Sequence, residues 1–113
     1  MGAHNFRTNA IGKFDANGAY KQAVEDAQWE NGHCPYNGTI STTHGFGLRT
    51  DNPRFGTKAF WEWESKILDD ECGKRECFAV EIKGKVLKDW KERSGWKGKR
   101  GVRAFYFFGV AAS

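Results

Sequence analysis

Four segments of the chain have the pattern of strands. Residues 4–11 alternate loosely between apolar and polar side chains, and residues 39–43 are mostly β-branched, so we expect a strand in each. Residues 77–83 alternate more strictly, which predicts a strand with one face in solvent. Residues 102–111 are apolar at both parities apart from Arg103, which is typical of a central strand covered on two sides.

Two segments have the pattern of helices. Residues 19–30 carry one apolar stripe, and Asp15 or Asn17 can cap the first turn. Residues 57–68 place apolar groups on one broad face, and residues 86–93 can form either a short helix or an extended basic arm. The stripe consists of Tyr20, Ala23, Val24 and Ala27, and the broad face of Phe60, Trp61, Glu64, Ile67 and Leu68, with Trp63 toward the other side.

Strands and helices alternate in this prediction, and the length of 113 residues suits one domain with a modest core. We therefore expect a single α+β domain over residues 1–113, built as an α/β two-layer sandwich. It would contain one small sheet of about four strands, with two or three helices packed on one face.

Composition adds three constraints. Aromatic residues make up 15% of the chain and five of them are Trp, more than a small core uses, so we expect some on a working surface. No apolar run approaches the ~20 residues of a membrane span, and no leader pattern precedes the first strand. The odd number of cysteines, three, argues against a disulfide framework and for a reducing cytoplasm.

Cysteines and histidines offer two kinds of chemistry. Cys72 and Cys77 form a C-x4-C pair, which Cys34 and either His33 or His44 can extend to four ligands. Structural zinc sites use matched, closely spaced pairs, and the second pair here is not one, so we expect no metal and no cofactor.

Histidine catalysis is a separate alternative. His33 and His44 flank a predicted turn and strand, and two facing histidines can serve as general acid and base in a small phosphodiesterase or nuclease. Neither belongs to a recognisable catalytic motif. We expect binding without catalysis, with His33 and His44 as the catalytic pair if the chain is an enzyme.

A turn rich in hydrogen-bond donors lies in the middle of the chain. Its glycines and hydroxyl groups suit a phosphate, although neither a P-loop nor a G-x-G-x-x-G motif is present and a plain Thr-rich strand has the same sequence pattern. The candidate anion-binding residues in this turn are Tyr36, Asn37, Gly38, Thr39, Ser41 and Thr43.

Positive charge is concentrated near the end of the chain. Residues 83–103 contain nine Lys and Arg against Asp89 and Glu92, a net charge of +7, which leaves −3 for the rest of a chain whose total is +4. Cations mixed with Trp favour phosphate attraction together with base stacking, although a solvated loop is the plain alternative. The candidate residues are Lys97, Lys99, Arg100 and Arg103 for anions, and Trp61, Trp63, Trp90 and Trp96 for stacking or interfaces.

Two stretches, G-H-C-P-Y-N-G-T-I-S-T-T at residues 32–43 and F-Y-F-F-G-V-A-A-S at residues 105–113, resemble a family of small, largely uncharacterised bacteriophage proteins. That family has a G-H-x-x-Y-x-G-T-I element and ends in an F-F-G-x-A-S strand. The resemblance implies no activity. It implies a phage accessory protein, a group in which counter-defence roles are common.

Three hypotheses follow for function. The first is a counter-defence protein that blocks a bacterial immune system by binding a nucleotide second messenger or a nucleic-acid-binding effector. The second is a protein–protein inhibitor of a CRISPR or other defence complex, anchored by exposed Trp. The third is the histidine-dependent phosphodiesterase. Under the first two, the partner is a host defence protein or nucleoprotein complex or a nucleotide signal, the location is the cytoplasm of the infected bacterium, no membrane is involved, and a homodimer or higher homo-oligomer is compatible.

Overall fold

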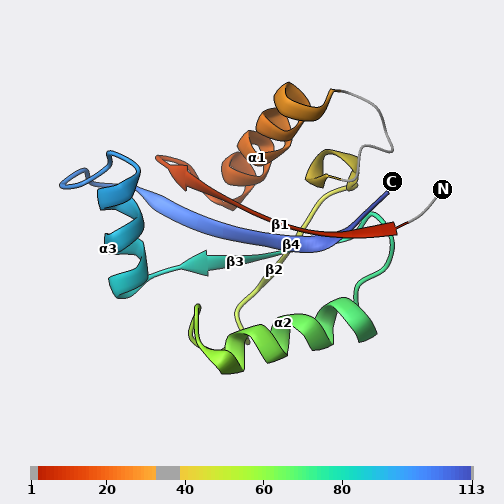
Figure 1. Cartoon of the computed structure of the whole chain (residues 1–113). Coiled ribbons are helices and arrows are strands. Elements are labelled where there is room, and N and C mark those ends of the chain that lie inside the picture. Colours follow the sequence, from red (N-terminus) through yellow and green to blue (C-terminus); the bar gives the residue numbers. More distant parts are fainter. Residues whose placement is uncertain (1–2, 33–38, 113) are drawn as a thin grey trace.

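The computed structural model describes residues 3–32 and 39–112. Figure 1 shows a curved sheet with helices above and below it and with α3 at one end. The elements follow in the order β1 (Ala3–Gly12), α1 (Ala16–Asn31), the 3-10 helix η1 (Ile40–Thr42), β2 (Gly47–Arg49), α2 (Lys58–Asp70), β3 (Cys77–Ile82), α3 (Gly84–Arg93) and β4 (Arg103–Ala112).

The last strand, β4, lies inside a four-stranded mixed sheet of order β1-β4-β3-β2. It pairs antiparallel with all of β1, from Ala112 opposite Ala3 to Arg103 opposite Gly12, and antiparallel with β3 on its other side. The short strand β2 runs parallel to β3 at the edge. The predicted α+β class, a sheet of four strands and the central place of the last strand are confirmed.

Helices cover both faces of the sheet, which corrects the expectation that they would all lie on one face (Figure 1). On one face, Phe105 and Phe107 of β4 pack with Ala23 of α1. On the other face, Phe108 of β4 packs with Phe60 of α2. The physical reason is that β4 is apolar at both its odd and its even positions. Each face of the sheet therefore presents a hydrophobic row, and a helix buries each row.

Strand β3 is also buried on both faces, whereas the sequence predicted one face in solvent. Its inward side chains Val80 and Ile82 face α2 and α3, as the alternation indicated, but Cys77 and Ala79 are also buried, on the α1 face. The expected solvated face of this strand is therefore wrong. Small side chains at these two positions leave room for α1 to lie close to the sheet.

Two helices begin at side-chain caps. The Asp15 carboxylate accepts a hydrogen bond of 2.9 Å from the Gly18 N–H, which confirms the first of the two predicted caps of α1. The Thr57 hydroxyl accepts one of 3.2 Å from the Phe60 N–H at the start of α2. Such caps satisfy backbone N–H groups that the first turn leaves without intrahelical partners.

Residues 39–43 do not form the predicted strand. Thr39 caps the short helix η1 through its side chain, and the Thr42 and Thr43 N–H groups donate to the carbonyls of Thr39 and Ile40. Hydroxyl side chains can hydrogen-bond to backbone groups within three residues of themselves. Here these local hydrogen bonds outweigh the β propensity of the segment. The second strand forms later, at Gly47–Arg49, outside the segment expected to be a strand.

The two Trp residues of α2 exchange the places predicted for them. Phe60, Glu64, Ile67 and Leu68 are buried as expected, but Trp61 is 40% exposed, and the half-buried Trp63 packs on Phe60 and Phe108. Helical spacing explains the exchange, because position 63 falls on the same side as positions 60, 64 and 67, whereas position 61 falls beside it.

Candidate anion-binding surface around α3

The helix α3 closes one end of the sheet. The chain leaves β3 at Ile82, turns at Gly84, whose φ of 69° lies in the left-handed region that favours glycine, and enters the helix without a side-chain cap. Val86, Leu87 and Trp90 pack against the core on the α2 side. This single apolar face directs the remaining, mostly charged, side chains of the helix toward solvent.

The connection from α3 to β4 is folded back onto the helix. The Trp96 N–H donates to the Lys91 carbonyl over 2.8 Å, and the Lys99 N–H donates to the Trp96 carbonyl over 3.0 Å. The Lys91 ammonium in turn donates to the Lys99 carbonyl over 2.8 Å. These bonds fix the backbone of the connection against α3, so its exposed cations project from a folded segment and not from a free arm.

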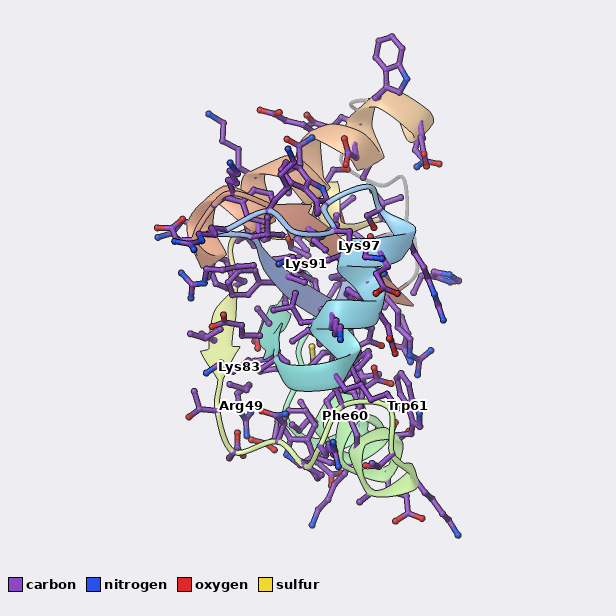
Figure 2. The ribbon with its side chains drawn as sticks, turned by 90° about the vertical axis from the view of Figure 1, so that its left-hand side faces the viewer. Arg49, Phe60, Trp61, Lys83, Lys91 and Lys97 are labelled. Carbon is purple, nitrogen blue, oxygen red and sulfur yellow. The ribbon has the colours of Figure 1, made fainter. Side chains whose placement is uncertain are left out.

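The resulting surface is strongly positive. Lys91 is half-buried, but the other cations of residues 83–100 are exposed, and the only carboxylates of this segment belong to Asp89 and Glu92. Figure 2 looks onto this end, with Lys91 and Lys97 beside the later part of α3 and Lys83 near Arg49 on the β2 side. We call the exposed set the α3 basic surface: Lys83, Lys85, Lys88, Arg93, Lys97, Lys99 and Arg100.

Two hollows flank α3. One, of about 460 Å³, lies between the helix and the following connection, with Leu87 at its apolar wall and Lys88, Lys91 and Lys97 around it. The other, of about 380 Å³, lies between the first turn of α3 and the segment around β2. Each combines apolar side chains with cations, an arrangement suited to a ligand that has both an apolar and an anionic part.

Arg103, predicted to bind an anion, is engaged by a carboxylate. Its Nε and Nη2 donate to the two oxygens of Glu81 over 3.0 and 2.9 Å, and its guanidinium lies 5.1 Å from the centre of the Phe105 ring. The hydrogen bond to Arg103 lowers the pKa of Glu81 below its ordinary value. Arg103 therefore contributes little net charge to the α3 basic surface.

Arg49, at the end of β2, is held in a similar way. It donates to both oxygens of Asp51 over 2.9 and 2.8 Å, and its guanidinium lies over the rings of Trp63 and Phe78. The Arg49 hydrogen bonds lower the pKa of Asp51 to about 2. A second carboxylate, Glu71, lies 3.5 Å from the same guanidinium.

The Trp residues occupy unequal positions. Trp90 packs edge-on against Phe55 and is half-buried, as is Trp96 in the connection after α3. Trp61 packs on Phe55 with two fifths of its surface exposed. The most exposed is Trp29 of α1, at 90%, which the sequence reasoning did not single out; its place outside the apolar stripe of the first helix was the available signal.

The hydroxyl groups around η1 have partners inside the protein. Thr42 is 3% exposed, and its hydroxyl donates to the Thr39 carbonyl and accepts from the Ala112 N–H of β4. The Thr43 hydroxyl lies 2.6 Å from that of Tyr20, and the Thr39 hydroxyl lies 2.8 Å from that of Ser41. These groups fasten η1 to α1 and β4. Tyr36, Asn37 and Gly38 lie outside the described residues.

The candidate catalytic and metal residues are only partly described. His44 is exposed beside η1, whereas His33 and Cys34 lie outside the described residues. Burial raises the pKa of the Cys77 thiol, and more weakly that of Cys72. Within residues 3–32 and 39–112, no group of three or more His, Cys, Asp or Glu side chains is placed to hold a metal ion.

A buried polar cluster ties β1, α2 and β4 together. The Glu64 carboxylate, 1% exposed, accepts from Arg7 over 2.8 Å and from the Tyr106 hydroxyl. Burial, and then the bond to Glu64, raise the pKa of Tyr106. A glutamate inside an apolar helical face was the sequence signal. Because the carboxylate is closed to solvent, this cluster offers no access to a substrate, and removing one partner would leave a buried charge unpaired.

Comparison of the chain with known protein families, with curated proteins and with solved structures finds no match. The surface around α3 therefore has to be interpreted from its own geometry. Among the helices that the structure describes, none has the length and apolar character needed to cross a membrane.

Proposed function

We propose that this protein acts by binding an anionic, nucleotide-bearing partner at the α3 basic surface, without catalysis. The observation that supports it is the display of seven exposed Lys and Arg side chains on one short helix and a hydrogen-bonded connection. Clustered cations attract a phosphate chain, and a backbone that is already held by hydrogen bonds lowers the ordering cost of binding. The surface lacks a fork of closely paired arginines, so we expect attraction to phosphates and no reading of sequence.

The biological role belongs to the same proposal. The resemblance to small bacteriophage proteins supports a counter-defence role, in which the protein blocks a bacterial immune system in the cytoplasm of the infected cell. It would do so by taking up a nucleotide signal or by binding the nucleic acid that a nucleic-acid-binding effector carries. In both routes the recognised chemistry is phosphate joined to a nucleoside.

The test is a binding measurement with a charge-matched control. Fluorescence anisotropy with a labelled oligothymidine and a labelled duplex would compare the native protein with the triple variant Lys97→Glu, Lys99→Glu and Arg100→Glu. We expect affinity to fall about tenfold or more, and the slope of log affinity against log salt for the single strand to shrink by about 2.

The matched control reverses three exposed lysines away from α3: Lys21 on α1, Lys66 on α2 and Lys74 before β3. It changes the net charge by the same amount, so it separates a local site from overall charge. Equal weakening by the two triple variants would contradict a specific surface. Full binding by the α3 variant would reject the proposal.

A protein–protein inhibitor is the second candidate, and the exposure of Trp29 at 90% and Trp61 at 40% favours it. Large exposed aromatic side chains are frequent anchors of protein interfaces. In an assay of defence inhibition, the variants Trp29→Ala and Trp61→Ala should then abolish the effect, while the charge reversals leave it intact. The opposite pattern supports the α3 basic surface.

A further inference from the structure

The hollow between β2 and α3 has two chemically distinct sides. Its apolar side is formed by Leu48, Phe55 and Val86. Its charged side includes Arg54, Lys83 and Lys85, all exposed. The volume of about 380 Å³ lies in the range of small-molecule sites.

The charges on this hollow do not cancel. Its one carboxylate, Glu81, is engaged by Arg103, and Arg49 is engaged by Asp51. In the part of the chain that the structure describes, the cationic groups of Arg54, Lys83 and Lys85 form no ion pair. Three cations thus face the hollow with their charge available to an anion.

The apolar side also has surface without a partner in the described protein. Leu48 of the edge strand β2 is 49% exposed and lines the hollow. Phe55 is anchored by edge contacts to Phe60 and Trp90, so its ring is fixed in place at the wall of the hollow. A flat apolar group of a ligand can therefore pack against Phe55, and little side-chain entropy of the protein is lost on binding.

We infer that this hollow is a binding site for one nucleoside phosphate unit. The base would lie against Leu48 and Phe55, and the phosphate would face Lys83, Lys85 and Arg54. This inference rests on the proposed function and adds to it a defined pocket, on the β2 side of α3, separate from Lys97 and Lys99. The unit is either a free nucleotide or one nucleotide of a single strand, and both present the same chemistry.

The site can be mapped by nuclear magnetic resonance on the full chain. Backbone amide signals would be followed during titration with adenosine monophosphate, a cyclic dinucleotide and an oligothymidine of about ten nucleotides. We expect the largest shifts within residues 48–55 and 81–86. If adenosine monophosphate or the cyclic dinucleotide binds, the ligand is a free nucleotide. If only the oligothymidine binds, the ligand is one nucleotide of a single strand.

Two variants and a control probe the two sides of the hollow. Lys83→Gln with Lys85→Gln should weaken nucleotide binding about tenfold, since two charge-assisted contacts are lost. Leu48→Ala should weaken binding of the nucleotide severalfold and leave pyrophosphate unaffected, because pyrophosphate has no base. Lys21→Gln with Lys66→Gln, on α1 and α2 and outside the α3 basic surface, should change mononucleotide affinity less than twofold. Phe55 is left unchanged because it packs on Phe60 and Tyr106.

Several results would overturn the pocket. Amide shifts confined to residues 94–100, unchanged affinity in both hollow variants, or pyrophosphate binding as tightly as the nucleotide would each reject it. Loss of mononucleotide binding in the Lys83 and Lys85 variant, with retained binding in the Lys21 and Lys66 variant, supports it. These outcomes are independent of the charge-reversal test, which concerns extended polyanions and the connection after α3.

Discussion

Around η1 the polar groups point into the protein, whereas around α3 the charged groups point into solvent. Both regions carried the sequence features of an anion site. At η1, the Thr42 and Thr43 hydroxyls bond to the backbone and to Tyr20. At α3, Lys97 and Arg100 are exposed on a connection held by its own hydrogen bonds.

The difference shows how side-chain length decides the use of a polar group. A threonine hydroxyl reaches only the nearest backbone, so once η1 packs beside β4 it takes a local partner. A lysine carries its ammonium far from the chain and keeps it hydrated. Changes around η1 should therefore alter stability, and changes around α3 should alter binding.

The largest stability effect is expected at Thr42. The variant Thr42→Val keeps the shape but removes the hydroxyl that accepts from the buried Ala112 N–H, which loses this partner, whereas the Thr39 carbonyl keeps its bond from the Thr42 N–H. We expect a loss of about 2 kcal/mol in the free energy of unfolding, measured by urea denaturation. The exposed Thr50→Val is the control, with a change below about 0.5 kcal/mol. Equal losses in the free energy of unfolding for the two variants would show that the Thr42 hydrogen bonds add no stability beyond that of an exposed threonine.

A smaller, pH-dependent effect is expected at Glu81. Because Arg103 lowers the folded-state pKa of Glu81 from its ordinary 4.5, this carboxylate stabilises the fold above pH 4.5. That contribution is lost as the pH falls through the lowered pKa. Melting temperatures between pH 7 and pH 2 should drop less steeply for Glu81→Gln than for the native protein. Parallel curves would contradict the pairing.

The smallest stability effect is expected on the α3 basic surface. Neutralising Lys97, Lys99 and Arg100 to Gln removes exposed charges that form no ion pair among the described residues. Each change should shift the free energy of unfolding by less than about 0.5 kcal/mol. A large loss of stability would mean that these cations stabilise the fold. It would contradict the contrast in which η1 residues affect stability and α3 residues affect binding.

Local pattern predicted most elements, and the errors have local or spatial causes. The apolar run through Phe107 and Phe108 correctly indicated a central strand, and the stripe through Ala23 correctly indicated α1. The segment 39–43 was mistaken for a strand because propensity counts side-chain shape and does not count competing hydroxyl bonds. All helices were expected on one face, although the two-sided burial predicted for residues 102–111 already required cover on both faces.

For the candidate surface too, one part was evident in the sequence and another part was not. The density of Lys and Arg in residues 83–103 was evident in the sequence. Which of them remain available to a ligand was not, since Glu81 engages Arg103 from a neighbouring strand. The hollow beside α3 was missed because Leu48 and Phe55 come from a different part of the chain than Lys83 and Lys85.

The sequence by itself determined the order of strands and helices and the concentration of positive charge, because both depend on residues close together in the chain. Only the tertiary structure decided which charges are paired and which side chains meet. Arg7 and Glu64 lie 57 positions apart, and the walls of the hollow between β2 and α3 come from separate elements. Such contacts depend on strand order and on which face each helix covers, and no local spacing encodes either of these.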